Sequence, residues 1–239
     1  MIFAAGLGSR LKHITEHKPK ALVSINDKTL LQLNIEKLIE FGIKDIIVNV
    51  HHFSEQVKSF LQENNNFNVN ITVSDETGLL LDTGGGLKKA SVLLKDSNPI
   101  LLQNVDIFSD IDYSKMLNYH IKHNSLATLA VQNRDSSRYL LFNNENKLSG
   151  WQNVKTKEKI ITRDSDKLHQ YSFSGIHIIS PKIFDMLPNY DVFSIVKLYL
   201  DISKDNNIIS YLHNKDVWFD VGTVERLNKF EKYMNSIKK

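Results

Sequence analysis

The chain has 239 residues, a net charge of +3 and no cysteine, which excludes a disulfide framework and a thiolate metal site. Its composition, 41% hydrophobic and 24% charged, is that of a globular protein with an ample core. Lysines and acidic residues are interspersed, and no apolar run reaches transmembrane length, so neither a nucleic acid nor a membrane is an expected partner. We expect a cytoplasmic protein, because the chain opens on a strand pattern rather than a signal peptide.

Apolar segments alternate with helical patterns through the first half of the chain. Strands are predicted at 2–5, 46–50, 71–74 and 100–105, and helices at 30–41, 54–61 and 84–94. Gly42 stands where a glycine ends a helix, and Ser54 is placed to cap the start of the next one. This alternation is typical of an α/β fold with a largely parallel sheet and helices on both faces.

The alternation of predicted strands and helices becomes less regular after Asp106. Strands are predicted at 126–132, 139–142, 171–179, 208–212 and 217–220, and helices at 116–123, near 193–202, from Pro181, and after a capping Thr223. We expect the second half to extend the sheet and to add a smaller lobe. The length suits one large α/β domain, residues 1–239.

The segment after the first strand carries two glycines, and Arg10 and Lys20 are its candidate cations. Gly6, Gly8 and Arg10 follow the apolar run, and Lys20 comes shortly after them. Glycines let backbone N–H groups approach an anion, and the two cations add fixed positive charge. The segment therefore predicts a polyphosphate cradle at the end of the first strand. It is not a dinucleotide fingerprint, because Leu11 stands where the third glycine is needed, and the chain contains no P-loop run.

The run Ala4-Ala-Gly-Leu-Gly-Ser-Arg-Leu11, together with Lys18-Pro-Lys-Ala-Leu-Val23, resembles the sugar-1-phosphate nucleotidyltransferases, or NDP-sugar pyrophosphorylases. The shorter members without a β-helix domain are most similar, namely the N-acetylmuramate-1-phosphate uridylyltransferases and the mannose- or heptose-1-phosphate guanylyltransferases. The resemblance implies a Rossmann-like nucleotidyltransferase fold with a mostly parallel mixed sheet flanked by helices. It further implies a nucleotide-binding half at 1–110 and a sugar-binding half at 111–239.

Two aspartates follow apolar strands far apart in the sequence. Asp106 ends the run from Ile100 to Val105, and Asp220 lies in Trp218-Phe-Asp-Val-Gly-Thr223. Carboxylates that converge at strand ends bind Mg²⁺ through oxygen, with phosphate and water in the remaining positions. Either aspartate alone also fits a helix cap or a turn. The resemblance assigns Mg²⁺ to both.

The resemblance also assigns the nucleotide. It implies that the loop residues bind the triphosphate, namely Ala5, Gly6, Leu7, Gly8 and Ser9. Arg10 is expected to hold the departing β- and γ-phosphates, and Lys20 to bridge the α-phosphate and the incoming phosphate. The resemblance assigns the nucleobase and ribose to a second glycine segment, Thr83, Gly84 and Gly85. Glu76 is a further candidate, because Ser74-Asp-Glu76 resembles a stretch near the base pocket.

The sugar side is less well matched. Gly175 corresponds to a glycine that lies against the sugar, although a β-bulge would also explain it. Many relatives carry a Glu-Lys-Pro triplet that meets the sugar phosphate, whereas this chain has Gly150-Trp-Gln-Asn-Val-Lys155 in that region. Lys155 or Arg138 is therefore the candidate for that charge.

The reaction implied is attack of a sugar 1-phosphate on the α-phosphorus of an NTP, which gives an NDP-sugar and pyrophosphate. The nucleophile is already an anion near neutral pH, so positioning and positive charge are needed rather than a general base. UTP is favoured, because Leu80-Leu-Asp-Thr-Gly-Gly85 resembles the uridylyltransferase version, and GTP comes next. The alternatives are CTP-dependent transfer to phosphocholine or a similar phosphorylated alcohol, and a non-catalytic sugar-nucleotide sensor. The sequence leaves the sugar and the oligomeric state open.

Overall fold

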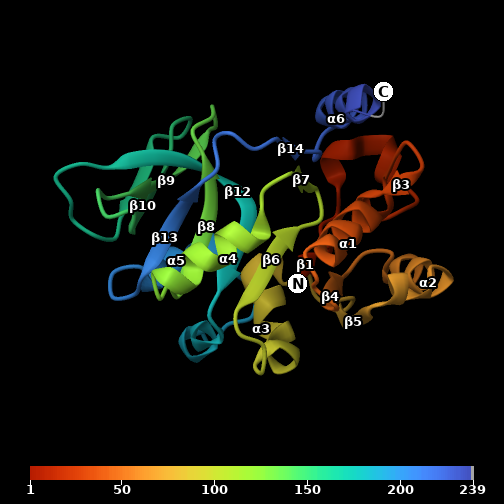
Figure 1. Ribbon diagram of the computed structural model, residues 1–239, viewed down its shortest axis with the longest axis horizontal. Helices are drawn as coiled ribbons and strands as arrows, with labels where there is room; N and C mark the ends of the chain where they lie inside the picture. The colour runs from red at the N-terminus through yellow and green to blue at the C-terminus, as the bar shows by residue number, and fades with distance from the viewer. Residues whose placement is uncertain (238–239) are drawn as a thin grey trace. The chain divides into compact units, whose positions relative to one another are not determined.

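The computed structural model describes residues 1–237, apart from the side chain of Lys12, as two compact units (Figure 1). Unit 1 comprises Met1–Leu80, Gln103–Asp110 and the carboxyl-terminal segment from Val217. Unit 2 comprises Leu81–Leu102 and Ile111–Asp216. Each unit is therefore assembled from stretches that are separated along the chain.

Unit 1 is built on a parallel sheet with the strand order β6–β1–β4–β5. These strands are β1 (Ile2–Phe3), β4 (Asp45–Val50), β5 (Asn70–Asp75) and the end of β6 (Ile100–Asn104). All residues of β4 after Asp45 are buried, as expected for a parallel strand covered on both faces. Because the strands are parallel, their carboxyl ends meet at one edge of the sheet, where α/β proteins place ligands.

Three helices complete unit 1, and they are the red, orange and blue helices of Figure 1: α1 (Leu30–Glu40), α2 (Ser54–Glu63) and α6 (Val224–Ile237). Three 3₁₀ turns and two short strand pairs join them: η1 (Ser9–Thr15), η2 (Lys20–Leu22), η3 (Asn65–Asn68), β2 (Ser24–Ile25) with β3 (Lys28–Thr29), and β7 (Ile107–Ser109) with β14 (Trp218–Asp220). Helix α1 buries Leu31, Ile35 and Leu38 on one face, which is the expected helical spacing. Thr29 caps its start by accepting a hydrogen bond from Gln32 N at 3.1 Å.

Unit 2 contains an antiparallel sheet with one parallel edge. Its strands run β11–β10–β9–β12–β8, all antiparallel, and β13 joins β8 in parallel. The strands are β8 (Ala127–Gln132), β9 (Arg138–Phe142), β10 (Leu148–Asn153), β11 (Glu158–Ile161), β12 (His169–Ile179) and β13 (Ile208–Leu212). The helices are α3 (Asp82–Leu94), α4 (Tyr113–Lys122), α5 (Ile195–Ile202) and the 3₁₀ helix η4 (Pro181–Met186).

The predicted α/β class with a mixed, Rossmann-like sheet is confirmed, and Thr223 caps α6 by accepting from Arg226 N at 3.3 Å. One prediction is wrong. Ser54 is the first residue of α2 rather than its cap, because Phe53, with φ 56°, takes the cap position. The Ser54 hydroxyl instead accepts a hydrogen bond from Thr77 Oγ1 at 3.1 Å. Among the described residues, no helix is long and apolar enough to cross a membrane.

Candidate functional site

The glycine loop leaves the sheet at the carboxyl end of β1. Gly8 has φ +67°, a conformation that favours glycine, and its carbonyl accepts from Leu11 N at 2.8 Å and from Thr15 Oγ1 at 2.9 Å. These bonds close the loop onto η1. A Cβ on Gly8 would stand 3.1 Å from Lys20 Cβ, so the loop and the lysine are in contact.

Most of the loop after β1 is exposed to solvent. Ala5 is buried, whereas Gly6, Leu7, Ser9 and Arg10 are exposed and Gly8 is half-buried. A Cβ on Gly6 would meet nothing within 4 Å. Leu11, which is 0% exposed, anchors η1 in the core and thereby leaves Arg10 at the surface. The predicted triphosphate loop is therefore accessible along most of its length.

Three charged groups meet beside Gly222. The point where a Cβ of Gly222 would stand lies 2.7 Å from Asp220 Oδ1, 2.9 Å from Arg10 Nη2 and 3.3 Å from Asp106 Oδ2. The two carboxylates therefore lie within reach of one shared ion. A side chain at residue 222 would occupy the space among these groups, so glycine keeps it free.

Backbone pairing explains this convergence. Strand β14 pairs antiparallel with β7, and Asp220 stands opposite Ile107, the residue after Asp106. The Asp106 carbonyl accepts from Val221 N at 2.9 Å. Segments that are far apart in sequence are thus joined directly next to both aspartates.

Lys20 pairs with the first aspartate. It is the first residue of η2, after Pro19, and its ammonium group donates to Asp106 Oδ2. The side chains are only 10% and 15% exposed. Because a partly buried ion is costly without its partner, each charge depends on the other or on a ligand that replaces it.

Arg226 is a further cation that the sequence analysis did not select. Its guanidinium donates to Asp220 Oδ2, while Asp220 Oδ1 accepts from Gly222 N at 2.8 Å. The signal was available, because Arg226 falls in the first turn of the helix that Thr223 was predicted to cap. A side chain there can reach back to the strand that precedes the helix.

Glu76 lies in a buried polar chain across the sheet edge. The Asn49 amide accepts from Ala4 N at 2.6 Å and donates to Glu76 Oε1 at 2.6 Å. Asn49 and Glu76 are 2% and 1% exposed. The amide thus links the ends of three strands next to the glycine loop. Asn49 was also missed, although a lone asparagine in the apolar run Ile46–Val50 is a usable signal.

The second glycine segment lies in the first turn of α3, in unit 2. Its glycines are packed closely, since a Cβ on Gly84 would stand 2.3 Å from Phe193 Cδ2 and one on Gly85 would stand 1.9 Å from Asp191 O. The N–H groups of Gly84 and Gly85 donate to Phe193 O at 2.9 and 3.1 Å, and Thr83 Oγ1 accepts from Ile195 N at 3.0 Å. These contacts lie within unit 2, and the nucleobase role of the segment stays a prediction.

The three sugar-side candidates also lie in unit 2. Gly175 has φ +71° and sits where the register of β12 with β8 shifts between Phe173 and His177. Arg138 begins β9 opposite Asn153, the last residue of β10, and the exposed Lys155 lies in the turn that follows. The structure therefore brings Arg138 and Lys155 to one end of the β9–β10 pair.

Comparison with known proteins identifies the family. A model described as nucleotidyl transferase matches residues 1–236. The chain belongs to the nucleotidyl transferase family.

This nucleotidyl transferase is 28% identical over 236 residues to an N-acetylmuramate α-1-phosphate uridylyltransferase of Neisseria meningitidis, with 96% of the chain and 95% of that protein covered. It is 26% identical over 225 residues to a mannose-1-phosphate guanyltransferase of Yarrowia lipolytica, with 93% of the chain but only 60% of that longer protein covered. Its fold matches crystalline HddC from Yersinia pseudotuberculosis with a TM-score of 0.73 at 21% identity, covering 98% of this chain and 97% of that one.

The donor set in this nucleotidyl transferase fits a hard divalent cation. Among residues 1–237 no group of three or more histidine, cysteine or acidic side chains gathers as a closed metal cage. Two converging carboxylates are instead what Mg²⁺ commonly receives from a protein, with the other positions left to phosphate and water. Lys20, Arg10 and Arg226 place positive charge beside the two carboxylates. Lysine and arginine are the side chains that proteins use to bind phosphate groups.

Proposed function

We propose that the protein transfers a nucleotidyl group from an NTP to a sugar 1-phosphate and releases pyrophosphate. The family match and the names of the two relatives support this class of reaction. The observation that carries the proposal is the meeting of Asp106, Asp220 and Arg10 around one point, with Lys20 paired to Asp106.

The chemistry required is the approach of two anions. A phosphate oxygen of the sugar 1-phosphate forms a bond to the α-phosphorus, and the bond to the bridging oxygen of pyrophosphate breaks. Fixed positive charge offsets both the repulsion and the charge that develops. We assign Arg10 to the departing phosphates, and Lys20 to the α-phosphate and the incoming phosphate. Mg²⁺ held by Asp106 and Asp220 would supply further charge at that phosphate.

We propose UTP as the preferred nucleotide and GTP as the next. The uridylyltransferase relative covers nearly the whole of both chains, whereas the guanyltransferase is almost as similar over a smaller share of its own length. The base side is assigned to Thr83, Gly84, Gly85 and Glu76, and the sugar side to Gly175, Arg138 and Lys155.

The test is a pyrophosphate-release assay with purified protein. Each of the four NTPs is combined with Mg²⁺ and a panel of sugar 1-phosphates, with phosphocholine included as an acceptor. We expect release only when an NTP and a sugar 1-phosphate are both present, and the fastest release with UTP. Release with CTP and phosphocholine alone would establish the cytidylyltransferase alternative, and no release with any pair would favour a sensor.

The Asp106→Asn variant tests the metal site with little change to the fold. It keeps the size of the side chain but removes a carboxylate ligand, so we expect it to lose the Mg²⁺-dependent rate. Asp45→Asn is the matched control, because Asp45 is an exposed aspartate of the same unit that accepts from Asn70 Nδ2 at 2.9 Å. An Asp106→Asn protein with a normal response to Mg²⁺ would remove this residue from the metal site.

A further inference from the structure

A polar side chain of α1, that of Asn34, lies in the core and bonds to the backbone next to Asp106. Asn34 is 5% exposed, and the other buried residues of the helix are leucines and an isoleucine. Its Nδ2 donates to Leu30 O at 2.8 Å within the helix and to Val105 O at 3.0 Å. A buried amide is costly unless it is hydrogen-bonded, so this side chain has a defined orientation.

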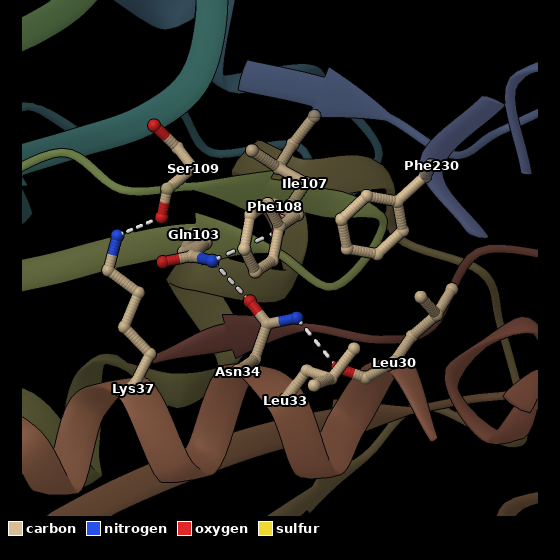
Figure 2. Close-up of a pocket in the computed structure, with 9 residues that line it drawn as sticks. All are labelled: Leu30, Leu33, Asn34, Lys37, Gln103, Ile107, Phe108, Ser109 and Phe230. Carbon is tan, nitrogen blue, oxygen red and sulfur yellow. Dashed lines mark hydrogen bonds between the residues drawn. The ribbon is translucent and has the colours of Figure 1, made fainter. Parts of the chain in front are cut away.

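Asn34 is extended by a second buried amide. Gln103, at 2% exposure, donates through Nε2 to Asn34 Oδ1 and to Ile107 O at 3.2 Å. Figure 2 shows the two amides facing each other, with Phe108 and Phe230 beside them. These residues line a small pocket that also includes Lys37, whose ammonium group donates to the backbone carbonyl of Ser109.

The two amides bracket Asp106. Asn34 holds the carbonyl before it, at Val105, and Gln103 holds the carbonyl after it, at Ile107. The Asp106 carbonyl itself is held by Val221 N. Three successive carbonyls are therefore fixed from α1, from β6 and from Val221, the residue after β14. Ile107 is also the residue that stands opposite Asp220.

We infer that Asn34 is a positioning residue for the metal-binding pair. Through Val105 and Gln103 it sets the backbone on both sides of Asp106, and so the spacing of that carboxylate from Asp220. Packing alone would be met by an apolar side chain of similar volume, whereas the amide adds direction. The inference rests on the proposed function, because it assigns Asn34 to the magnesium site proposed there.

The test measures Mn²⁺ binding to the intact protein by the loss of the free-ion EPR signal. Asn34→Leu keeps the volume and removes both hydrogen-bonding groups. We expect it to raise the Mn²⁺ dissociation constant about tenfold, as loss of a group that orients a metal ligand does. The Mg²⁺ concentration for half-maximal rate should rise by a similar factor, with the KM for the sugar 1-phosphate unchanged at saturating Mg²⁺.

Lys37→Met is the matched control. Lys37 lies on the same face of α1 and donates to Ser109 O at the other end of β7. We expect it to lower stability to urea while leaving the Mn²⁺ constant within about twofold. Gln103→Met provides a second variant if Asn34→Leu does not fold, and it should also weaken Mn²⁺ binding.

The outcomes separate the inference from the function on which it rests. Wild-type protein that binds no Mn²⁺ would overturn the proposed metal site and the inference with it. Wild-type binding with equal binding by Asn34→Leu, or by Gln103→Met, would overturn the inference alone and leave Asn34 a core residue. Equal weakening by Lys37→Met would also overturn it, because any loss of α1 contacts would then suffice.

Discussion

The two glycine segments look alike in the sequence and differ in the structure. In unit 1, Gly6 is exposed and a Cβ on it would meet nothing within 4 Å. In unit 2, a Cβ on Gly85 would stand 1.9 Å from a backbone oxygen. The first segment leaves its backbone open to solvent, whereas the second uses its missing side chains to bring α3 against the segment from Asp191 to Phe193.

A glycine motif therefore has two physical uses. Glycine can let a ligand approach the backbone, or it can let another part of the same protein approach it. Only the surroundings decide between them. The lysines beside the two segments also differ. Lys20, beside the first segment, pairs with Asp106 of the proposed metal site, whereas Lys88, beside the second, pairs with Asp191 at 2.8 Å.

The largest expected effect is that of replacing Lys20 with methionine, and the same change at Lys88 is its control. Lys20→Met should lower turnover by a factor on the order of 10²–10³, because it removes one fixed charge from the transition state. Lys88→Met has the same chemistry beside the other glycine segment and should leave turnover within about twofold, as expected for an exposed ion pair. Steady-state rates of pyrophosphate release measure both effects, and equal losses in the two variants would contradict the contrast between the two glycine segments.

Filling the free space beside Gly222 should have the next largest effect. In Gly222→Ala the new methyl group would stand among Asp220, Arg10 and Asp106. We expect the rate to fall on the order of 10²-fold, since small misplacements of reacting groups cost about that much. Circular dichroism should show a folded protein. An active Gly222→Ala enzyme would mean that nothing binds in that space.

Alanine substitutions in the two glycine segments should have different effects, on stability in the second segment and on NTP binding in the first. Gly85→Ala should lower the free energy of unfolding by about 1–3 kcal/mol, because the methyl group overlaps a backbone oxygen. Gly6→Ala should change it by less than about 0.5 kcal/mol, as for an exposed site, while raising the KM for the NTP. Urea denaturation and NTP titrations test the pair. A destabilised Gly6→Ala variant, or a stable Gly85→Ala variant, would contradict the contrast.

The smallest expected effect concerns the core of unit 2. Burial lowers the pKa of His120 to about 4 and that of His177 to about 3, from an ordinary value of 6.5. The neutral ring is favoured in the fold, so this stability is fully present above pH 6.5 and is lost as the pH falls below it. Each histidine should lower the free energy of unfolding by about 1 kcal/mol when the pH falls from 7 to 5.5. Urea midpoints of His120→Gln should fall less steeply with acid than those of the wild type, and an identical slope would contradict the assignment.

Unit 1 could be predicted well from the sequence because its signals are local. Apolar runs such as 46–50 and helical spacing such as 30–41 lie within single elements, and both elements formed close to their predicted bounds. Asp106 and Asp220 were selected because each follows an apolar strand. What remained hidden was the pairing of β7 with β14, since a pair of three-residue strands has no periodicity to detect.

Contacts between distant residues account for the other misses. Strands β10 and β11 escaped prediction because the run Gly150-Trp-Gln-Asn153 has little strand character of its own, and its strand forms through pairing with β9. The bonds of Asn34 and Gln103 join α1 to the β6–β7 segment across the core. Their sequence positions indicate only a helix and a strand, so the relation of these amides to Asp106 emerged with the fold.

The most direct test of the account is a crystal structure of the protein with Mn²⁺ and UTP, with the metal located by its anomalous scattering. We expect a peak within coordination distance, about 2.2 Å, of a carboxylate oxygen of both Asp106 and Asp220. A peak bound by only one of these carboxylates, or placed at other residues while the nucleotide is bound, would contradict it.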